Sequence, residues 1–260
     1  MMKRVPVVRL CKQALIWQVL AVCALAAPAV SAAELTVLSG GAIEPGLRAA
    51  AATFEKQTGH TVQITFNTAP QIRARVGAGE SWDVVIAPEA VVDEFTRTGK
   101  LNSQRVTVGR VGLGVAVRPG APVPDISSAE ALKRSVRAAD SIVFNRASTG
   151  VYFEGLLKKM GVYEQVEGKI TRYADGASVM EHVLKGKGAE IGFGALTEIL
   201  LQREKGLRLV GPLPAEVQNY TSYAAAPMTA ASSAQLAVEF VRHLVSPAGK
   251  ELFAAAGIER

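Results

Sequence analysis

From about residue 35 onward, short apolar or alternating segments are interspersed with segments whose apolar residues recur every three to four positions. The first pattern predicts β-strands and the second predicts amphipathic helices. Strands are expected over 35–40, 60–67, 82–88, 108–120, 141–145, 169–174, 190–194, 207–214 and 220–228. Helices are expected over 46–58, 69–80, 91–100, 129–139, 234–245 and 247–257, near 178–185, and after the RAST segment at 146–149. This alternation predicts an α/β fold.

The helix expected after RAST has two kinds of residue: apolar residues that are expected in the core, and small polar residues at its start that are candidates for ligand binding. Phe153, Leu156, Leu157 and Met160 recur at helical spacing, which is typical of a face that packs into the core. The small polar residues in front of them lie at the start of the helix. Exposed amides at such a start can bind an anion.

The first 33 residues have the three-part pattern of a secretory signal peptide. A basic front precedes an apolar run over 14–30, and the small residues Ser31, Ala32 and Ala33 follow. Cleavage is expected before Glu34, with a site before Ala33 as the alternative. An uncleaved anchor is disfavoured because the run is short for a membrane span. Lipidation at Cys23 is a minor alternative. The pattern predicts a periplasmic protein.

Removal of the signal peptide changes the composition of the mature chain. Both cysteines, Cys11 and Cys23, lie in the first 33 residues, so the mature chain would have no disulfide and no thiol nucleophile. Four of the 29 lysines and arginines lie there, and none of the 23 acidic residues, which lowers the net charge from +6 to about +2. Nucleic-acid binding therefore loses its compositional support.

Four junctions between an expected strand and an expected helix consist of small or hydroxyl residues. They cover 39–42, 67–70, 146–150 and 175–178. At the carboxyl edge of an α/β sheet, such turns present helix-start amides to a ligand. Each turn taken alone is also explained as an ordinary helix cap. The candidate ligand-binding residues are Ser39, Gly40, Gly41, Ala42, Thr68, Ala69, Pro70, Arg73, Asn145, Arg146, Ser148, Thr149, Gly150, Asp175, Gly176 and Ser178.

The ordered set of segments resembles the periplasmic solute-binding proteins of the molybdate-binding type, over essentially the whole mature chain. The segments that carry the resemblance are LTVLSGGAIEPGL, TFNTAPQIRARVGAGESWDVVIAPE, STGVYFEGLLKKMGVYE, GKGAEIGFGALTEI and VEFVRHLVSPAGKELFAAAGI. The resemblance implies two α/β lobes, each a mixed sheet flanked by helices, that close by a hinge over a small anion. It also implies an ABC permease in the inner membrane as the partner.

On this basis, residues 34–112 and 226–260 are expected to form the first lobe and residues 113–225 the second. A monomer is expected, because hinge closure needs two free lobes. No metal, cofactor or nucleic acid is expected.

The chain departs from the molybdate-binding pattern at three places. Ala42 and Ala69 stand where that family has ligand-binding serines, and Ala195 stands where it has a tyrosine. The nearby Ser39 and Thr68 are offset from the serine positions. Thr149 and Gly176 match positions where the family uses backbone amides.

Loss of two hydroxyls and a phenol weakens the case for a tetrahedral oxyanion, since buried ligand oxygens without partners are costly. Arg146 and Arg73 could add guanidinium groups that suit a carboxylate. We therefore expect an organic or larger anion, with molybdate or tungstate as the alternative ligand.

Enzymes and ligand-sensing proteins on the same fold are the competing functional classes. His60, His182 and His243 are far apart, no nucleophile stands beside them, and surface or capping roles are expected for them. Asp83 and Asp175 could act as an acid and base only if the fold brought them together. A strand-end or helix-cap role is expected for each, and the chain is not expected to be an enzyme.

Overall fold

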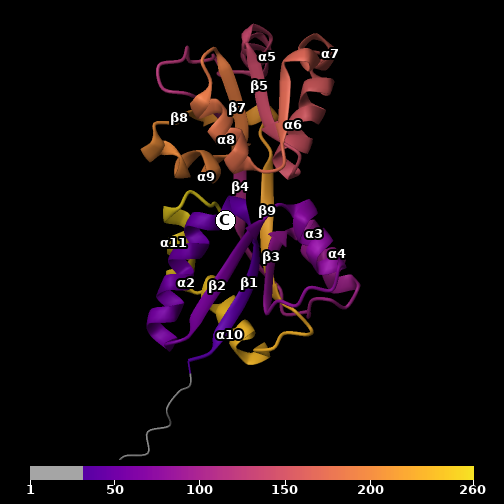
Figure 1. The fold of residues 1–260 in the computed structure, drawn as a ribbon, viewed down its shortest axis with the longest axis vertical. Coiled ribbons are helices and arrows are strands. Elements are labelled where there is room, and N and C mark those ends of the chain that lie inside the picture. The colour runs from indigo at the N-terminus through magenta and orange to yellow at the C-terminus, as the bar shows by residue number, and fades with distance from the viewer. Residues whose placement is uncertain (1–31) are drawn as a thin grey trace, which may run out of the picture. The chain divides into compact units, whose positions relative to one another are not determined.

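The computed structural model describes residues 32–260 (Figure 1), so the expected signal peptide lies outside the described residues except for its last two positions. The strands are β1 (Glu34–Gly40), β2 (Thr61–Asn67), β3 (Val84–Pro88), β4 (Val106–Val117), β5 (Ser141–Asn145), β6 (Ile170–Tyr173), β7 (Glu190–Ala195), β8 (Arg208–Pro212) and β9 (Tyr220–Pro227). The α-helices are α2 (Glu44–Thr58), α3 (Ala69–Gly77), α4 (Glu89–Arg97), α5 (Ala129–Ala138), α6 (Ser148–Lys159), α7 (Tyr163–Val166), α8 (Gly176–Lys185), α9 (Leu196–Leu201), α10 (Ala234–Leu244) and α11 (Pro247–Ala255). Short 3-10 helices are η2 (Gly41–Ile43), η3 (Glu167–Lys169), η4 (Arg203–Lys205) and η5 (Ala215–Val217).

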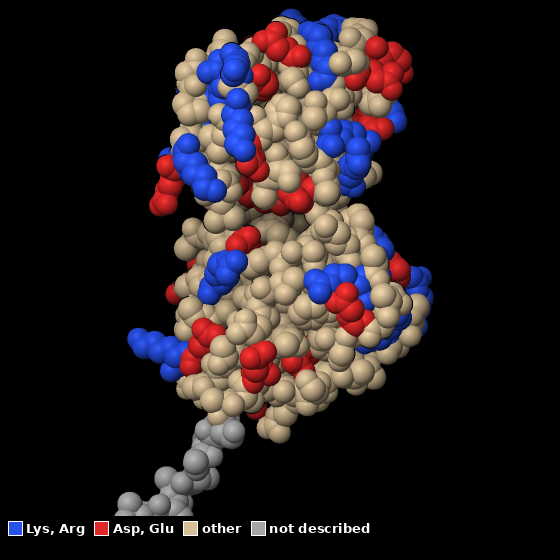
Figure 2. Space-filling model, in the orientation of Figure 1, with Lys and Arg blue, Asp and Glu red and all other residues tan. Residues whose placement is uncertain are grey.

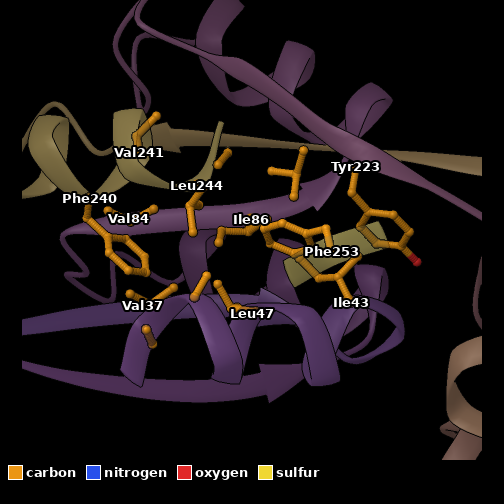
Figure 3. Close-up of a cluster of buried hydrophobic side chains, with 14 of the residues drawn as sticks. Val37, Ile43, Leu47, Val84, Ile86, Tyr223, Phe240, Val241, Leu244 and Phe253 are labelled. Atoms are coloured by element: carbon orange, nitrogen blue, oxygen red, sulfur yellow. The ribbon is translucent and has the colours of Figure 1, made fainter. Parts of the chain in front are cut away.

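The first lobe is a mixed sheet in the order β2-β1-β3-β9-β4. β1 is parallel to β2 and β3, whereas β9 is antiparallel to β3 and to the first part of β4. β1 is apolar on both faces because helices cover both. Val37 packs with α2, α10 and α11 (Figure 3), and Leu38 packs with α3 and α4 on the opposite face.

The second lobe is built around the outer part of β4. β7 and β8 are antiparallel to it, and β5 lies parallel to β7 and β6. Its core contains three aromatic rings from β5, α6 and β7. The rings of Phe153 and Phe193 stack with centroids 3.7 Å apart, and Phe144 meets Phe153 edge-on at 5.4 Å. Phe153, Leu156 and Leu157 are buried, as the helical spacing predicts.

β4 and β9 join the two lobes (Figure 1). Pairing of β4 with β9 extends to Gly112, and pairing with β7 begins at Leu113. β9 pairs only with β3 and β4, so the chain is back in the first sheet from Tyr220 onward. The boundary expected between 225 and 226 lies inside this strand.

The two-lobed α/β fold expected from the sequence is confirmed. Two helices were not expected: α7, and α9, which follows β7 without a loop. α9 packs against β4, β7 and β8, and it also contacts η2 and α2 of the first lobe. Among residues 32–260, none of the helices has both the length and the apolar character needed to cross a membrane.

Asp83 ties three segments of the first lobe together. It is 1% exposed and accepts hydrogen bonds from the amides of Thr36 and Ser233 at 2.9 Å each, and from the hydroxyls of Thr36 and Ser232. Burial raises the pKa of Asp83, but these hydrogen bonds outweigh it and hold the pKa below its ordinary value. The strand-end role expected for Asp83 is confirmed.

We predict that Asp83→Asn destabilises the protein by about 2–3 kcal/mol, because an amide nitrogen would face an N–H or hydroxyl donor. The melting temperature should fall by roughly 5–10 °C. Since the folded-state pKa of Asp83 is lowered, its contribution is lost as the pH falls through that pKa, and the variant should show a smaller loss of stability in acid. Thermal unfolding between pH 3 and pH 7 measures both effects. Asp93→Asn, at an exposed ion pair with Arg105, is the matched control, and an equal shift there would contradict the prediction.

Candidate functional site

A cavity of about 850 Å³ lies between the two lobes. Its walls come from the ends of β1 and β2 in the first lobe, from the ends of β5, β6 and β7 in the second, and from the helices that follow these strands. These are carboxyl ends of parallel strands, where open α/β sheets bind ligands. Figure 2 shows the narrowing between the lobes with acidic and basic side chains beside it.

Two helix starts of the second lobe line this cavity. α6 has no side-chain cap at Ala147, and the first-turn residues Ser148 and Thr149 form part of the wall. α8 begins at Gly176, after Asp175 has capped the amide of Ser178 at 2.8 Å. The remaining first-turn amides have no carbonyl to bond within their own helix, and the helix dipole favours negative charge there.

The first lobe contributes the turn at η2 and the start of α3. Gly40, Gly41 and Ala42 line the cavity after β1, and Thr68 and Ala69 line it after β2. The Thr68 hydroxyl and amide lie 2.9 and 2.8 Å from Oε1 of Gln71, in a capping box. This hydroxyl is therefore already paired within its own turn.

The RAST segment is held by Asn145, which is 3% exposed at the end of β5. Its Oδ1 accepts from the amides of Ala147 and Gly150 at 3.0 and 3.1 Å, and its Nδ2 lies 3.0 Å from the Thr149 hydroxyl. A Cβ at Gly150 would lie 1.7 Å from the Asn145 carbonyl oxygen, so only glycine fits. Asn145 thus fixes the shape of the turn, and Ser148 in this turn lines the cavity.

Eleven of the sixteen candidate residues line the cavity: Gly40, Gly41, Ala42, Thr68, Ala69, Asn145, Ser148, Thr149, Asp175, Gly176 and Ser178. Ser39, Pro70 and Gly150 lie outside its lining. Ser39 is fully buried, and its hydroxyl lies 3.2 Å from the carbonyl oxygen of Gly40. The structure therefore brings all four small-residue junctions to one cavity.

Neither candidate arginine lines the cavity. Arg73 pairs with Glu94 of α4 at 2.8 Å. Arg146 has an exposed side chain, and its amide donates to the Tyr173 carbonyl at 2.8 Å. The guanidinium partner expected for a ligand carboxylate is therefore absent from the walls that the described residues form, because strand and helix geometry turns both side chains elsewhere.

Among the cavity residues that were not candidates from the sequence, Glu198 and Tyr223 are the two with a raised pKa. Glu198 is the third residue of α9, and its Oε2 accepts from the Ala195 amide at 3.3 Å. A Cβ on Gly176 would lie 2.1 Å from this oxygen, and one on Gly41 would lie 3.6 Å from Oε1. The carboxyl group thus lies between a turn of each lobe. A Glu at this position of a helix is ordinarily a capping residue, so the sequence carries little signal for it.

Burial is the main cause that raises the pKa of Glu198 to about 7, and the negative charges of Asp175 and Glu44 add to it while the Ala195 amide opposes it. Tyr223 is 6% exposed on β9, and burial together with the nearby Glu198 raises the pKa of its phenol. The cavity therefore holds one group that changes its charge near neutral pH, beside a phenol that keeps its proton.

The charged residues of the cavity wall are mainly acidic. Glu44, Asp175, Glu181 and Glu198 line it, against two lysines, Lys185 and Lys205. Glu44 pairs with Arg48 at 2.7 Å, and Lys185 pairs with Glu181. The groups of the wall that favour negative charge are therefore the helix-start amides more than basic side chains.

Thr197, which precedes Glu198, forms a hydrogen bond between the two lobes. Thr197 is fully buried and its hydroxyl donates to the Ala42 carbonyl oxygen, from α9 to η2. Glu198 is therefore carried on a helix that is bonded to the first lobe and covalently continuous with the second.

The three histidines lie outside the cavity lining. His60 Nδ1 accepts from the Ala33 amide, His182 bonds to the Tyr173 hydroxyl, and His243 bonds to the Ala50 carbonyl. Within the described residues, no three His, Cys, Asp or Glu side chains are grouped to bind a metal ion.

Comparison with known proteins identifies the family. Residues 35–259 match the model of the bacterial extracellular solute-binding proteins. The chain belongs to this family. The resemblance to molybdate-binding proteins is confirmed at the level of fold. The periplasmic molybdate-binding protein of Azotobacter vinelandii superimposes with a TM-score of 0.74, at 18% identity over 87% of this chain and 99% of that one. The sulfate-binding protein SubI of Mycobacterium tuberculosis superimposes with a TM-score of 0.70, at 17% identity over 87% and 86%.

A relative of this solute-binding protein is named for an enzymatic activity. The aconitate isomerase of a Pseudomonas species is 31% identical over 219 residues, which cover 82% of each chain. This identity is above that of the two solved structures, which are 18% and 17% identical to this chain.

We predict that Glu198→Gln removes a pH-dependent loss of stability. A carboxyl group whose pKa rises from 4.5 to about 7 on folding binds its proton more tightly in the folded state. Stability of the wild-type protein should therefore fall, relative to the variant, as the pH rises from about 5 to 8, by at most about 3 kcal/mol. Chemical denaturation of both proteins over this range checks the sign. A difference that does not change with pH would contradict the prediction.

Proposed function

We propose that this solute-binding protein captures a small organic polycarboxylate between its lobes and delivers it to an ABC permease from the periplasm. The observation that carries the proposal is the lining of the cavity. Four helix-start or turn segments, two from each lobe, converge on one space of about 850 Å³, near the upper end of small-molecule pockets. A ligand with several separated carboxylates can engage several of these segments at once.

The same lining supports a polycarboxylate over a single tetrahedral oxyanion. Ala42 and Ala69 present methyl groups where the molybdate-binding family has hydroxyls, and the Thr68 hydroxyl is engaged by Gln71. Each oxyanion oxygen buried without a partner would cost about 1–3 kcal/mol. Carboxylates reaching Ser148, Thr149 and Gly176 in the second lobe avoid this cost.

Because both lobes contribute helix starts to the cavity, binding of the proposed ligand would favour closure of the lobes. Helix starts of one lobe alone would bind an anion without changing the relation between the lobes. A ligand that spans both sets of amides favours the closed state by its differential affinity for that state. The signal-peptide pattern and the family both support a periplasmic location and a permease partner.

We predict that calorimetry detects binding of cis- or trans-aconitate, citrate or tricarballylate, and no binding of molybdate, tungstate or sulfate at equal concentrations. Ala177→Phe should weaken carboxylate binding at least about tenfold, because the exposed second residue of α8 lines the cavity and its ring would fill it. Ala254→Phe, on an exposed face of α11, is the control. Arg146→Ala should leave the affinity unchanged.

Binding of molybdate or tungstate alone would overturn the polycarboxylate proposal. A large loss of affinity in Arg146→Ala would show that the lobes rearrange enough to bring this guanidinium to the ligand.

Isomerisation of aconitate is the second candidate function. It is favoured by the 31% identical relative and by the Glu198 carboxyl in the cavity wall. A double bond changes its geometry when a proton is removed from one carbon and returned to another, which leaves no net gain or loss of electrons. An acid–base group with a pKa near the working pH is suited to such a transfer, and the pKa of Glu198 is raised to about 7.

We predict that, if the cavity is catalytic, either aconitate isomer in D₂O is converted to the other with incorporation of deuterium, as followed by proton NMR. Glu198→Gln should lower turnover by at least about 100-fold while binding is retained. Glu204→Gln, an exposed carboxylate outside the cavity lining, should behave as the wild type. Stoichiometric binding without conversion would remove the enzymatic candidate and leave the transport function in place.

A further inference from the structure

The acidic character of the cavity is at odds with an anionic ligand. The Glu198 carboxyl group lies beside Gly176 of the second lobe and faces Gly41 of the first, and all three residues line the cavity. A ligand that bridges these two turns must therefore come close to this carboxyl group. Two like charges brought together in a partly dehydrated cavity repel each other strongly. Either the anion avoids this part of the cavity, or the carboxyl group loses its charge.

The surroundings of Glu198 offer an ionised carboxylate little support. Its one hydrogen-bond donor among the described residues is the Ala195 amide at 3.3 Å, and no ion pair with it is formed there. Asp175 at the start of α8 and Glu44 at the start of α2 add negative charge. Tyr223 on β9 is neutral, and η2 carries no titratable group. Farther along the wall, Lys185 is paired with Glu181, and Lys205 is exposed on η4.

Resting on the proposed capture of a carboxylate, we propose that Glu198 binds the ligand as a neutral acid. It takes up one proton from solvent when the anion enters, and it donates that proton in a hydrogen bond to a ligand carboxylate. Its other oxygen continues to accept from the Ala195 amide. Glu198 is in this sense a specificity-determining residue, since it favours a ligand that accepts a hydrogen bond at the junction of the lobes.

A neutral Glu198 that donates to the ligand and a Glu198 that only caps α9 predict different pH profiles of ligand binding. A glutamine at 198 can also accept from the Ala195 amide, and its side-chain amide can donate to the ligand without any proton uptake. The capping role alone therefore predicts no change in the pH profile of binding. Because the pKa of free Glu198 is about 7, proton uptake should be small at pH 6 and close to complete at pH 8.

The test is calorimetric titration with tricarballylate, a saturated tricarboxylate that cannot isomerise, in amine buffers of different ionisation enthalpy from pH 6.0 to 8.5. The wild type should take up between about 0.5 and 1 proton at pH 8, and its affinity should fall by up to about tenfold per pH unit above 7. Glu198→Gln should take up no proton. It should match the wild type at pH 6 and bind about tenfold more tightly at pH 8.

Two further variants distinguish the effect of the hydrogen-bond donor at position 198 from the effect of its charge. Glu198→Ala, which loses the donor as well as the charge, should bind more weakly than Glu198→Gln at every pH. Glu204→Gln should keep the wild-type profile. Binding with the same pH profile in the wild type and Glu198→Gln, or without proton uptake, would overturn the proposal for Glu198 and leave the proposed function standing. Absence of tricarboxylate binding in both proteins at every pH would instead overturn the proposed function.

Discussion

The site depends on the passage of β4 from one sheet to the other and on the return of the chain into the first sheet at the start of β9. Because the chain crosses the same boundary twice, the carboxyl ends of the parallel strands in each lobe line one cavity. The crossing is braced by one side chain: Gln218 accepts from the Leu113 amide at 2.9 Å and donates to the Leu113 carbonyl at 3.0 Å. The Leu113 amide also lies 3.2 Å from the Asn219 carbonyl. Rotation of the lobes about so narrow a connection needs changes in only a few residues.

Converging helix starts give a cavity with more acidic than basic side chains a means to bind the proposed anion. Backbone amides are fixed dipoles that need no basic residue, and they cannot be neutralised by a neighbouring carboxylate in the way that Lys185 is by Glu181. In this arrangement Glu198 is the wall residue whose charge changes near neutral pH. Under the proposed function, its charge state decides whether the field at the junction of the lobes repels or accepts a ligand carboxylate.

α9 joins a structural and a chemical role in two consecutive residues. Thr197 bonds to the Ala42 carbonyl of the first lobe, and Glu198 lies against Gly41 and Gly176. The tie through Thr197 holds the Glu198 carboxyl close to the first lobe, whereas α8 approaches it from the second. The proposed binding, the proposed closure and the proposed protonation of Glu198 would therefore involve the same few atoms. For this reason the two proposals, an acid–base role in catalysis and a proton-coupled role in binding, both centre on Glu198.

The sequence by itself determined the succession of strands and helices, the α/β class and the four small-residue junctions, because these follow from apolar periodicity and from local helix-start chemistry. The expectation of two lobes came from the resemblance of the ordered segments to a known family. For Asp83 and Asp175 the sequence predicted a strand-end or helix-cap role, and the structure assigns the strand end to Asp83 and the helix cap to Asp175. Only the tertiary structure decided which side chains meet the cavity. Arg73 is turned to Glu94 and Arg146 to solvent, whereas Glu198 and Tyr223 reach the ligand space from elements that are distant in sequence. The local periodicity of the sequence indicates which face of a helix or strand is buried. The direction and the pKa of a side chain depend instead on its tertiary neighbours, which come together only when β4 and β9 join the lobes.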